Sequence, residues 1–434
     1  MNTFTVQPGG TLSGVARVPG DKSISHRSIM LGALAEGETR VTGFLEGADC
    51  LATLEAFRAM GVPIERNGPG EVVIQGRGLH GLQAPDRPLD MGNSGTAMRL
   101  LCGVLAGQAF DSELIGDESL TRRPMRRVTE PLARMGAQIE TSEAGTPPLR
   151  IRGGAPLRGT DHVLQVASAQ VKSAILLAGL WAEGKTCVTE PAPTRDHTER
   201  MLNGFGCVVT RDGPKACVTG GGRLQASSVD VPADISSAAF FLVGASIATG
   251  SQMRLAHVGI NPTRTGVIDI LRLMGADIRV ENEREAGGEP VADIEVHAAP
   301  LKGIEIPTEL VPLAIDEFPA IFVAAACAEG ETVLTGAEEL RVKESDRIQV
   351  MADGLQALGV QCTVQPDGIR IQGGEGFSGG EVDSHGDHRI AMSFAMAGLR
   401  ASAPIRIRDC ANVATSFPGF VDLARTVGLA LEAA

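Results

Sequence analysis

The stretch IDILRLMGADIRV, residues 268–280, contains the pattern that organises this chain: apolar residues at helical spacing, a glycine, and then alternation. The pattern recurs at intervals of 69 to 84 residues, at Gly61, Gly136, Gly206, Gly275, Gly359 and Gly428. A glycine at this point takes the left-handed conformation that ends a helix, after which the apolar period changes from 3.6 to 2. A period of about 70 residues predicts one supersecondary unit used six times.

Each unit also begins with an apolar helix whose first turn is polar. These turns are Asp21-Lys22-Ser23, GNSGT (92–96), SAQ (168–170), PAD (232–234), IDE (315–317) and GDHR (386–389). Helix N-termini offer unpaired N–H groups and the positive end of the helix dipole. Six such ends directed at one place predict an anion-binding site.

Composition and charge bound the class of protein. The net charge of −13, the single Trp and the lack of Tyr argue against a nucleic-acid partner or an anionic membrane surface. No uninterrupted run of 18 apolar residues is present, and Met1–Gly20 lacks the features of a signal peptide. The eight cysteines form no C-x-x-C and are expected to be buried free thiols in a reducing cytoplasm.

A chain of 434 residues suggests two domains, with three units in each. The glycine- and serine-rich segment 220–232 is the expected seam. We therefore predict a first domain at residues 20–228, and a second at residues 1–19 and 229–434. A strand within Thr3–Val18 is expected to pair with the C-terminal half. Strands mixed with helices indicate an α/β architecture.

Two segments match known cofactor- or metal-binding motifs, but the residues around them argue against such sites. Residues 76–81, GRGLHG, match G-x-G-x-x-G, but Pro85 and Pro88 prevent the helix that a dinucleotide site needs. Residues 385–388, HGDH, are a weak metal motif, and H-E-x-x-H is absent. We expect no metal and no organic cofactor.

Cationic residues gather at several of the helix starts. Lys22 and Arg27 lie at the first, while Lys343 and Arg347 are four residues apart and share a helix face. Singly, each group is explained as well by a capping turn or by surface ion pairs. Their common position, together with segment 386–389, favours an anion site.

Eight motifs in order resemble the 5-enolpyruvylshikimate-3-phosphate synthase family. They are GDKSISHR (20–27), GNSGTAMR (92–99), SAQVKS (168–173), TRDHTE (194–199), AIDEFP (314–319), LRVKESDR (340–347), GDHRIAMSF (386–394) and TSFP (415–418). The resemblance implies two domains of three βαβαββ units, an inside-out α/β barrel type, with the active site in the cleft between them. It implies transfer of the enolpyruvyl group of phosphoenolpyruvate to the 5-hydroxyl of shikimate 3-phosphate, in aromatic amino-acid biosynthesis.

The resemblance also implies roles for individual residues. Those expected to bind phosphoenolpyruvate are Lys22, Asn93, Gly95, Arg123, Gln170, Arg347 and Arg389. Those expected to bind shikimate 3-phosphate are Lys22, Ser23, Arg27, Ser168, Ala169, Gln170, Arg195, Asp316 and Lys343. The candidate proton-transfer residues are Asp316, Glu344 and Lys22. Gly95 also lies where sensitive members of the family meet the inhibitor glyphosate.

The chain differs from the best-known members of the family at Leu100, Ala169, Lys172, Arg195 and Thr415. Thr415 replaces a lysine that contacts phosphate. Lys172 and Arg195 either hold the shikimate phosphate or are surface charges. These differences resemble the family's second, often glyphosate-tolerant class. That class is usually credited with alanine at the position of Gly95.

The chemistry of such a reaction agrees with these residue types. Two anionic substrates require cations gathered at one site, and forked arginines match carboxylate and phosphate groups. Two carboxylates in different surroundings divide the proton transfers. Asp316 is the expected base, and Glu344 near Lys22 the expected proton carrier, although the sequence leaves open which residue moves each proton.

Two alternative functions remain open at this point. UDP-N-acetylglucosamine enolpyruvyl transferase shares the unit, but it uses a loop cysteine that segment 116–123 lacks. A non-catalytic phosphate-binding protein would not need both Asp316 and Glu344. For the favoured function we expect a cytoplasmic monomer whose partners are its two substrates.

Overall fold

The computed structural model describes residues 2–374 and 376–434, which divide into two compact units. The central unit consists of Gly20–Val231 together with the turn Ala286–Glu289. The terminal unit consists of the residues up to Pro19, Pro232–Glu285 and Pro290–Ala434. Strand β15 (Ser228–Asp230) pairs with β3 (Ala35–Thr42), which carries the central unit as far as Val231.

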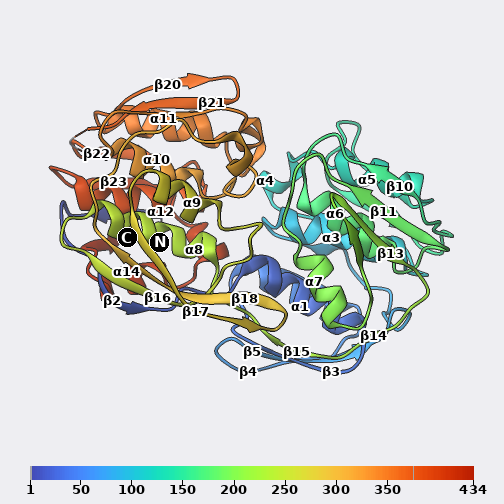
Figure 1. Cartoon of the computed structure of the whole chain (residues 1–434). Coiled ribbons are helices and arrows are strands. Elements are labelled where there is room, and N and C mark those ends of the chain that lie inside the picture. The colour runs from blue at the N-terminus through green and yellow to red at the C-terminus, as the bar shows by residue number, and fades with distance from the viewer. Residues whose placement is uncertain (1, 375) are drawn as a thin grey trace. The chain divides into compact units, whose positions relative to one another are not determined.

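Three apolar helices form the interior of each unit, and the strands lie outside them (Figure 1). The inner helices of the central unit are α1 (Lys22–Leu34), α3 (Gly95–Ala106) and α6 (Ala169–Ala178). Those of the terminal unit are α8 (Ile235–Ile247), α10 (Phe318–Ala326) and α12 (His388–Ala397). Every residue of α8, α10 and α12 is buried, including the polar residues at the start of α12, and most of these residues are apolar.

The six repeated glycines follow the outer helices, as the sequence predicts. These helices are α2 (Ala48–Ala59), α5 (Arg126–Arg134), α7 (His197–Gly204), α9 (Gly266–Leu273), α11 (Arg347–Ala357) and α14 (Phe420–Thr426). All six glycines have φ between +82° and +115°, a region that residues with a Cβ rarely adopt. The prediction that each glycine ends a helix is therefore confirmed.

The three sheets of the central unit are linked in a ring. The first orders its strands β14 (Leu224–Gln225), β3, β5 (Glu71–Arg77) and β4 (Ile64–Gly68), with β15 also beside β3. The second has β6 (Leu89–Asp90), β7 (Ser112–Ile115), β9 (Leu149–Arg152) and β8 (Gln138–Glu140). The third has β10 (Asp161–Val163), β11 (Lys185–Thr189), β13 (Lys215–Thr219) and β12 (Thr210–Asp212). Each repeat supplies one parallel strand to the sheet of the next, and the third supplies it to the first.

The terminal unit repeats this arrangement and uses the N-terminal strands to do so. Its sheets are β17 (Asp277–Ala286), β18 (Glu289–His297), β16 (Gln252–Gly259) and β2 (Ser13–Ala16); β19 (Glu331–Leu334), β21 (Gly368–Gln372) and β20 (Gln361–Gln365); and β22 (Gly380–Asp383), β23 (Ile405–Arg408), β1 (Thr3–Val6) and β24 (Leu431–Ala433). β1 pairs antiparallel with β23 and β24, and β2 pairs parallel with β16. The expected pairing of the N-terminal strand with the C-terminal half is confirmed.

A disulfide joins Cys187 and Cys217, which corrects the expectation that all eight cysteines are free. β11 and β13 pair antiparallel with these two residues directly opposite, and their Cα atoms are 4.1 Å apart. Sequence spacing does not reveal such a register, because 30 residues separate the two. The other six cysteines are free, and burial raises the pKa of Cys102 and of Cys327 to about 12.

Candidate active site

In the terminal unit, three carboxylates converge on one buried arginine. Arg347 begins α11 and its side chain is 1% exposed. Its Nε lies 2.8 Å from Asp387 Oδ2, its Nη2 2.6 Å from Glu344 Oε2, and its Nη1 3.3 Å from Asp316 Oδ1. Burial disfavours the charge, but the three carboxylates outweigh burial and raise the pKa of Arg347.

Asp316 lies just before α10, and two further cations lie near it. Lys343 Nζ is 3.3 Å from Asp316 Oδ1, and Arg389 Nη2 is 4.0 Å from Asp316 Oδ2. The structure thus brings together all five predicted site residues of this unit. Two carboxylates that share one cation but lie in different surroundings are suited to different roles in proton transfer.

Asp387 holds this cluster together, a role that the sequence did not reveal. It is fully buried, accepts the backbone N–H of Arg389 at 2.9 Å as the N-cap of α12, and accepts the Ser345 hydroxyl at 3.1 Å. Burial alone raises the pKa of a carboxyl, but Arg347 reverses this and the pKa of Asp387 is lowered. Within the described part of the chain, no group of three or more His, Cys, Asp or Glu side chains is placed to hold a metal ion.

In the central unit, the start of α1 presents Lys22 and Arg27. Lys22 Nζ is 3.1 Å from Asp49 Oδ2. Arg27 is buried and donates to Thr198 Oγ1 at 2.6 Å, to Ser173 Oγ at 2.8 Å and to a backbone carbonyl of its own helix. Burial lowers the pKa of Arg27 to about 10, and it remains a cation at neutral pH.

The start of α3 forms a second group, which includes an arginine without a predicted role. Arg99 Nη1 donates to Gln170 Oε1 at 2.7 Å, and Arg123 Nη2 donates to Asn93 Oδ1 at 2.8 Å. A Cβ at Gly95 would lie 2.9 Å from Arg99 Nη1 and 3.1 Å from Arg123 Nη1. The two guanidinium groups therefore flank the backbone of Gly95. The signal for Arg99 was its position four residues after Gly95, one helical turn away.

The start of α6 is capped by Ser168, whose hydroxyl accepts the N–H of Val171 at 3.4 Å. Arg195 lies in the loop before α7, near enough to Arg27 to lower its pKa. Lys172 is not a surface charge, which corrects one of the two alternatives expected of it. Its side chain is fully buried, and its Nζ is 2.8 Å from a carboxylate oxygen of Glu190.

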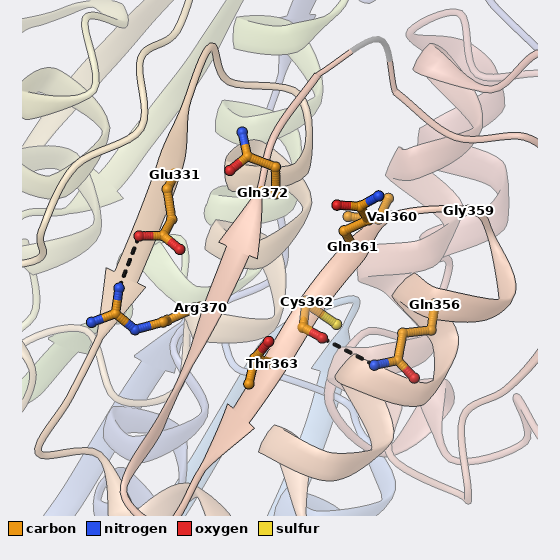
Figure 2. A pocket seen from close by; sticks show the side chains of 9 residues that line it. All are labelled: Glu331, Gln356, Gly359, Val360, Gln361, Cys362, Thr363, Arg370 and Gln372. Atoms are coloured by element: carbon orange, nitrogen blue, oxygen red, sulfur yellow. Dashed lines mark hydrogen bonds and ion pairs between the residues drawn. The ribbon is translucent and has the colours of Figure 1, made fainter.

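A surface hollow of the terminal unit lies apart from these groups (Figure 2). It is lined by residues of β19, β20, β21 and the end of α11, and none of the predicted site residues is among them. Its cation, Arg370, is 2.9 Å from Glu331 Oε2. The hollow offers no paired carboxylates beside several cations, so it does not match the predicted chemistry.

Residues 6–423 match the profile of one family, described as EPSP synthase (3-phosphoshikimate 1-carboxyvinyltransferase). The chain belongs to the EPSP synthase family. The chain is 71% identical over 428 residues to the 3-phosphoshikimate 1-carboxyvinyltransferase of Alkalilimnicola ehrlichii, covering 99% of this chain and 96% of that protein. It is 69% identical to the protein of the same name from Methylococcus capsulatus, with 99% and 98% covered.

The solved structure of EPSP synthase from Acinetobacter baumannii is similar over the whole chain, with a TM-score of 0.90 and 62% identity. The alignment covers 100% of this chain and 99% of that one. The predicted family, the two-domain α/β fold and the enzyme class, a carboxyvinyltransferase, are confirmed. The substrate assigned to each EPSP synthase site residue stays a prediction, as does the proximity of Lys22 to Glu344, which belong to different units.

Proposed function

We propose that this chain transfers the carboxyvinyl group of phosphoenolpyruvate to the 5-hydroxyl of shikimate 3-phosphate, releasing phosphate, within aromatic amino-acid biosynthesis. The family match over residues 6–423 supports the reaction. The observation that carries the chemistry is the convergence of Asp316 and Glu344 on Arg347, with Lys343 and Arg389 beside Asp316.

The reaction needs a proton added to the methylene carbon of phosphoenolpyruvate while a base removes the proton of the 5-hydroxyl. The tetrahedral intermediate then loses phosphate as the methyl carbon gives its proton back. Because Arg347 contacts both carboxylates, an anionic substrate that draws on the same guanidinium weakens its hold on them.

We assign the binding of shikimate 3-phosphate mainly to the central unit. Ser168 and Gln170 lie at the N-terminal turn of α6, where unpaired N–H groups favour a phosphate. Arg27 and the nearby Arg195 add charge that the doubly negative phosphate requires. Asp316 and Lys343 of the terminal unit complete the proposed set, so one ligand draws on residues of both units.

We further propose that the enzyme acts in the cytoplasm as a monomer. Phosphate esters and phosphoenolpyruvate do not cross bilayers unaided, because the cost of moving their charges into hydrocarbon is too high. The enzyme must therefore share a compartment with the reactions that make them. In the described residues, none of the helices is long and apolar enough to span a membrane.

Phosphate release in the presence of phosphoenolpyruvate tests the reaction. We expect release with shikimate 3-phosphate and none with UDP-N-acetylglucosamine, the acceptor of the alternative enzyme. Release with the UDP-sugar alone would contradict the proposal, and so would the absence of release with either acceptor. Light scattering of the same sample measures the mass, expected to be that of one 45.2 kDa chain.

A further inference from the structure

Lys172 lies one turn into α6, four residues after the cap Ser168, and its side chain is 0% exposed. Its Nζ is 2.8 Å from Glu190 Oε2 and 2.8 Å from Glu199 Oε1, and it donates to the carbonyl of Thr194 at 3.4 Å. Both carboxylates are themselves buried. The ammonium group of Lys172 is therefore buried among the protein's own carboxylates.

Two of the groups that Lys172 contacts belong to one loop, residues 190–196, which joins β11 to α7. Glu190 begins the loop and Thr194 lies near its end, directly before Arg195. The hydroxyl of Thr194 also donates to Glu190. Lys172 therefore ties both ends of this loop to the helix that begins at Ser168, and Arg195 is carried by the tied segment.

The third contact of Lys172 leads to Arg27. Glu199 lies in α7 beside Thr198, whose hydroxyl accepts from Arg27 Nε at 2.6 Å and donates to Ser173 Oγ at 2.7 Å. Ser173 is the residue after Lys172 and also accepts from Arg27 Nη2 at 2.8 Å. One turn of α6 thus supports both Arg27 and the loop that carries Arg195.

A buried ionic cluster contributes little to stability, but it holds the side chains that form it in one arrangement. The cost of taking charges out of water can exceed the energy that their pairing recovers, so stability is a weak explanation for a buried cluster of one lysine and two carboxylates. Glu199 also raises the pKa of the neighbouring Arg27, against the effect of burial. The carboxylates of this cluster therefore offset the charges of two cations, the buried Lys172 and the proposed substrate-binding residue Arg27.

We propose that Lys172 is a positioning residue for shikimate 3-phosphate, which holds loop 190–196 so that Arg195 stays beside Arg27 and the start of α6. This inference rests on the proposed function and on the predicted role of Arg195. Lys172 does not touch the substrate. Substitution of Lys172 should therefore weaken the binding of shikimate 3-phosphate only when Arg195 is present.

A double-mutant cycle between Lys172 and Arg195 tests this, with the dissociation constant of shikimate 3-phosphate measured by titration calorimetry. We expect Lys172→Met to weaken binding tenfold or more in the wild-type background. In the Arg195→Ala background the same change should weaken binding less than twofold, because the group that it positions is gone. Lys172→Arg keeps the charge and should restore most of the affinity.

Leu176→Ala is the matched control, since Leu176 is equally buried on the same helix but is apolar and forms no ion pair with the loop. It should lower the unfolding temperature and leave the dissociation constant unchanged within twofold. If Lys172→Met does not fold, the variant Lys172→Met/Glu190→Gln/Glu199→Gln removes the unpaired carboxylates and replaces it in the cycle.

Equal effects of the Lys172 change in both backgrounds would overturn the positioning role and leave the proposed function intact. Wild-type affinity in the Lys172 variant, or in Arg195→Ala alone, would overturn it as well. A wild-type enzyme that does not bind shikimate 3-phosphate would instead refute the proposed function, and this inference with it.

Discussion

Asp316 and Glu344 differ in the contacts that their carboxylates make, and their proposed roles differ accordingly. Lys343, Arg347 and Arg389 surround Asp316, whereas Glu344 pairs with Arg347 from the preceding turn. Cations stabilise a carboxylate in its ionised form, and on these contacts we propose Asp316 as the base. We propose Glu344 as the proton carrier.

We expect Glu344→Gln to lower kcat by about two to four orders of magnitude, the usual contribution of a proton-transfer group. The amide keeps the size and polarity of the side chain, so the dissociation constants of both substrates should change little. Steady-state kinetics and calorimetry together separate the two effects. Glu338→Gln, a change in an exposed carboxylate just before the same segment, is the control. A nearly normal kcat would remove Glu344 from the mechanism.

Gly95→Ala should raise the KM for phosphoenolpyruvate by about tenfold, equivalent to about 1.4 kcal/mol. The new Cβ would lie 2.9 Å from Arg99 Nη1 and 3.1 Å from Arg123 Nη1, so both guanidinium groups must shift. Because these are the ends of flexible side chains, the unfolding temperature should barely change. Gly204→Ala, where no atom lies within 4 Å of the added Cβ, serves as control. An unchanged KM would show that neither arginine is placed to bind this substrate.

His26 should make the enzyme less stable in mild acid. It is buried beside Thr53 and Ser94, and burial, with Lys22 and Arg27 nearby, holds its pKa well below the ordinary value. The unfolded chain takes up this proton below about pH 6.5, so the stabilising contribution is complete above that pH and is lost as the pH falls.

The expected loss is about 1.4 kcal/mol for each pH unit below about 6.5. His26→Gln should therefore lose less stability than the wild type between pH 7.5 and 5.5 in thermal unfolding. His80→Gln changes an exposed histidine and should behave as the wild type does. Parallel pH curves for the wild type and His26→Gln would contradict a neutral buried imidazole.

At the scale of elements, a repeated glycine can be needed for its positive φ alone, or also because a Cβ would have no room. Two substitutions in the central unit distinguish these two requirements. Gly206 has φ +83°, and the nearest atom to an added Cβ would be 3.9 Å away. Gly206→Ala should therefore lower the free energy of unfolding only through the strained backbone conformation, by about 1–2 kcal/mol. Gly136 has φ +107°, and its Cβ would also lie 2.8 Å from the carbonyl oxygen of Pro156. Gly136→Ala should lower the unfolding temperature further. An equal fall in unfolding temperature for the two variants would mean that the backbone at Pro156 moves away from the added Cβ without loss of stability.

The elements also show where sequence reasoning stops. The glycines, polar helix starts and strand alternation are local patterns, and they predicted the six units. The partners of Lys172 were not predictable, because Glu190 and Glu199 are 18 and 27 residues away and reach it only through the packing of a loop and α7 on α6. The pairing of Cys187 with Cys217 depends on strand register, which composition does not encode.

At the scale of the whole molecule, the proposed ligand residues divide between the units, so substrate binding should draw the units together. A ligand that contacts residues of both units has a higher affinity for a closed state, which is the condition for ligand-driven closure. We expect shikimate 3-phosphate to reduce the radius of gyration in solution scattering. Phosphoenolpyruvate should in turn bind more tightly when shikimate 3-phosphate is present.

Shikimate is the control ligand for that experiment, because it lacks the phosphate assigned to Ser168, Arg27 and Arg195. It should leave the scattering curve nearly unchanged at the same concentration. A radius of gyration that shikimate 3-phosphate does not alter would count against closure.

The sequence predicted which residues belong together in each half, because the motifs that contain them are local. It did not predict which carboxylates contact Arg347, because Asp387 reaches this arginine from a separate helix start.

The strands that complete the terminal unit also set an order for its folding during translation. β1 and β2 are made before the other strands, but the partners of β1, Ile405–Arg408 and Leu431–Ala433, are the last two strands to be made. The central unit lacks only the turn Ala286–Glu289 once Val231 has emerged, so it can assemble on the growing chain. The half of the enzyme that carries Asp316 and Glu344 is thus the half that forms last.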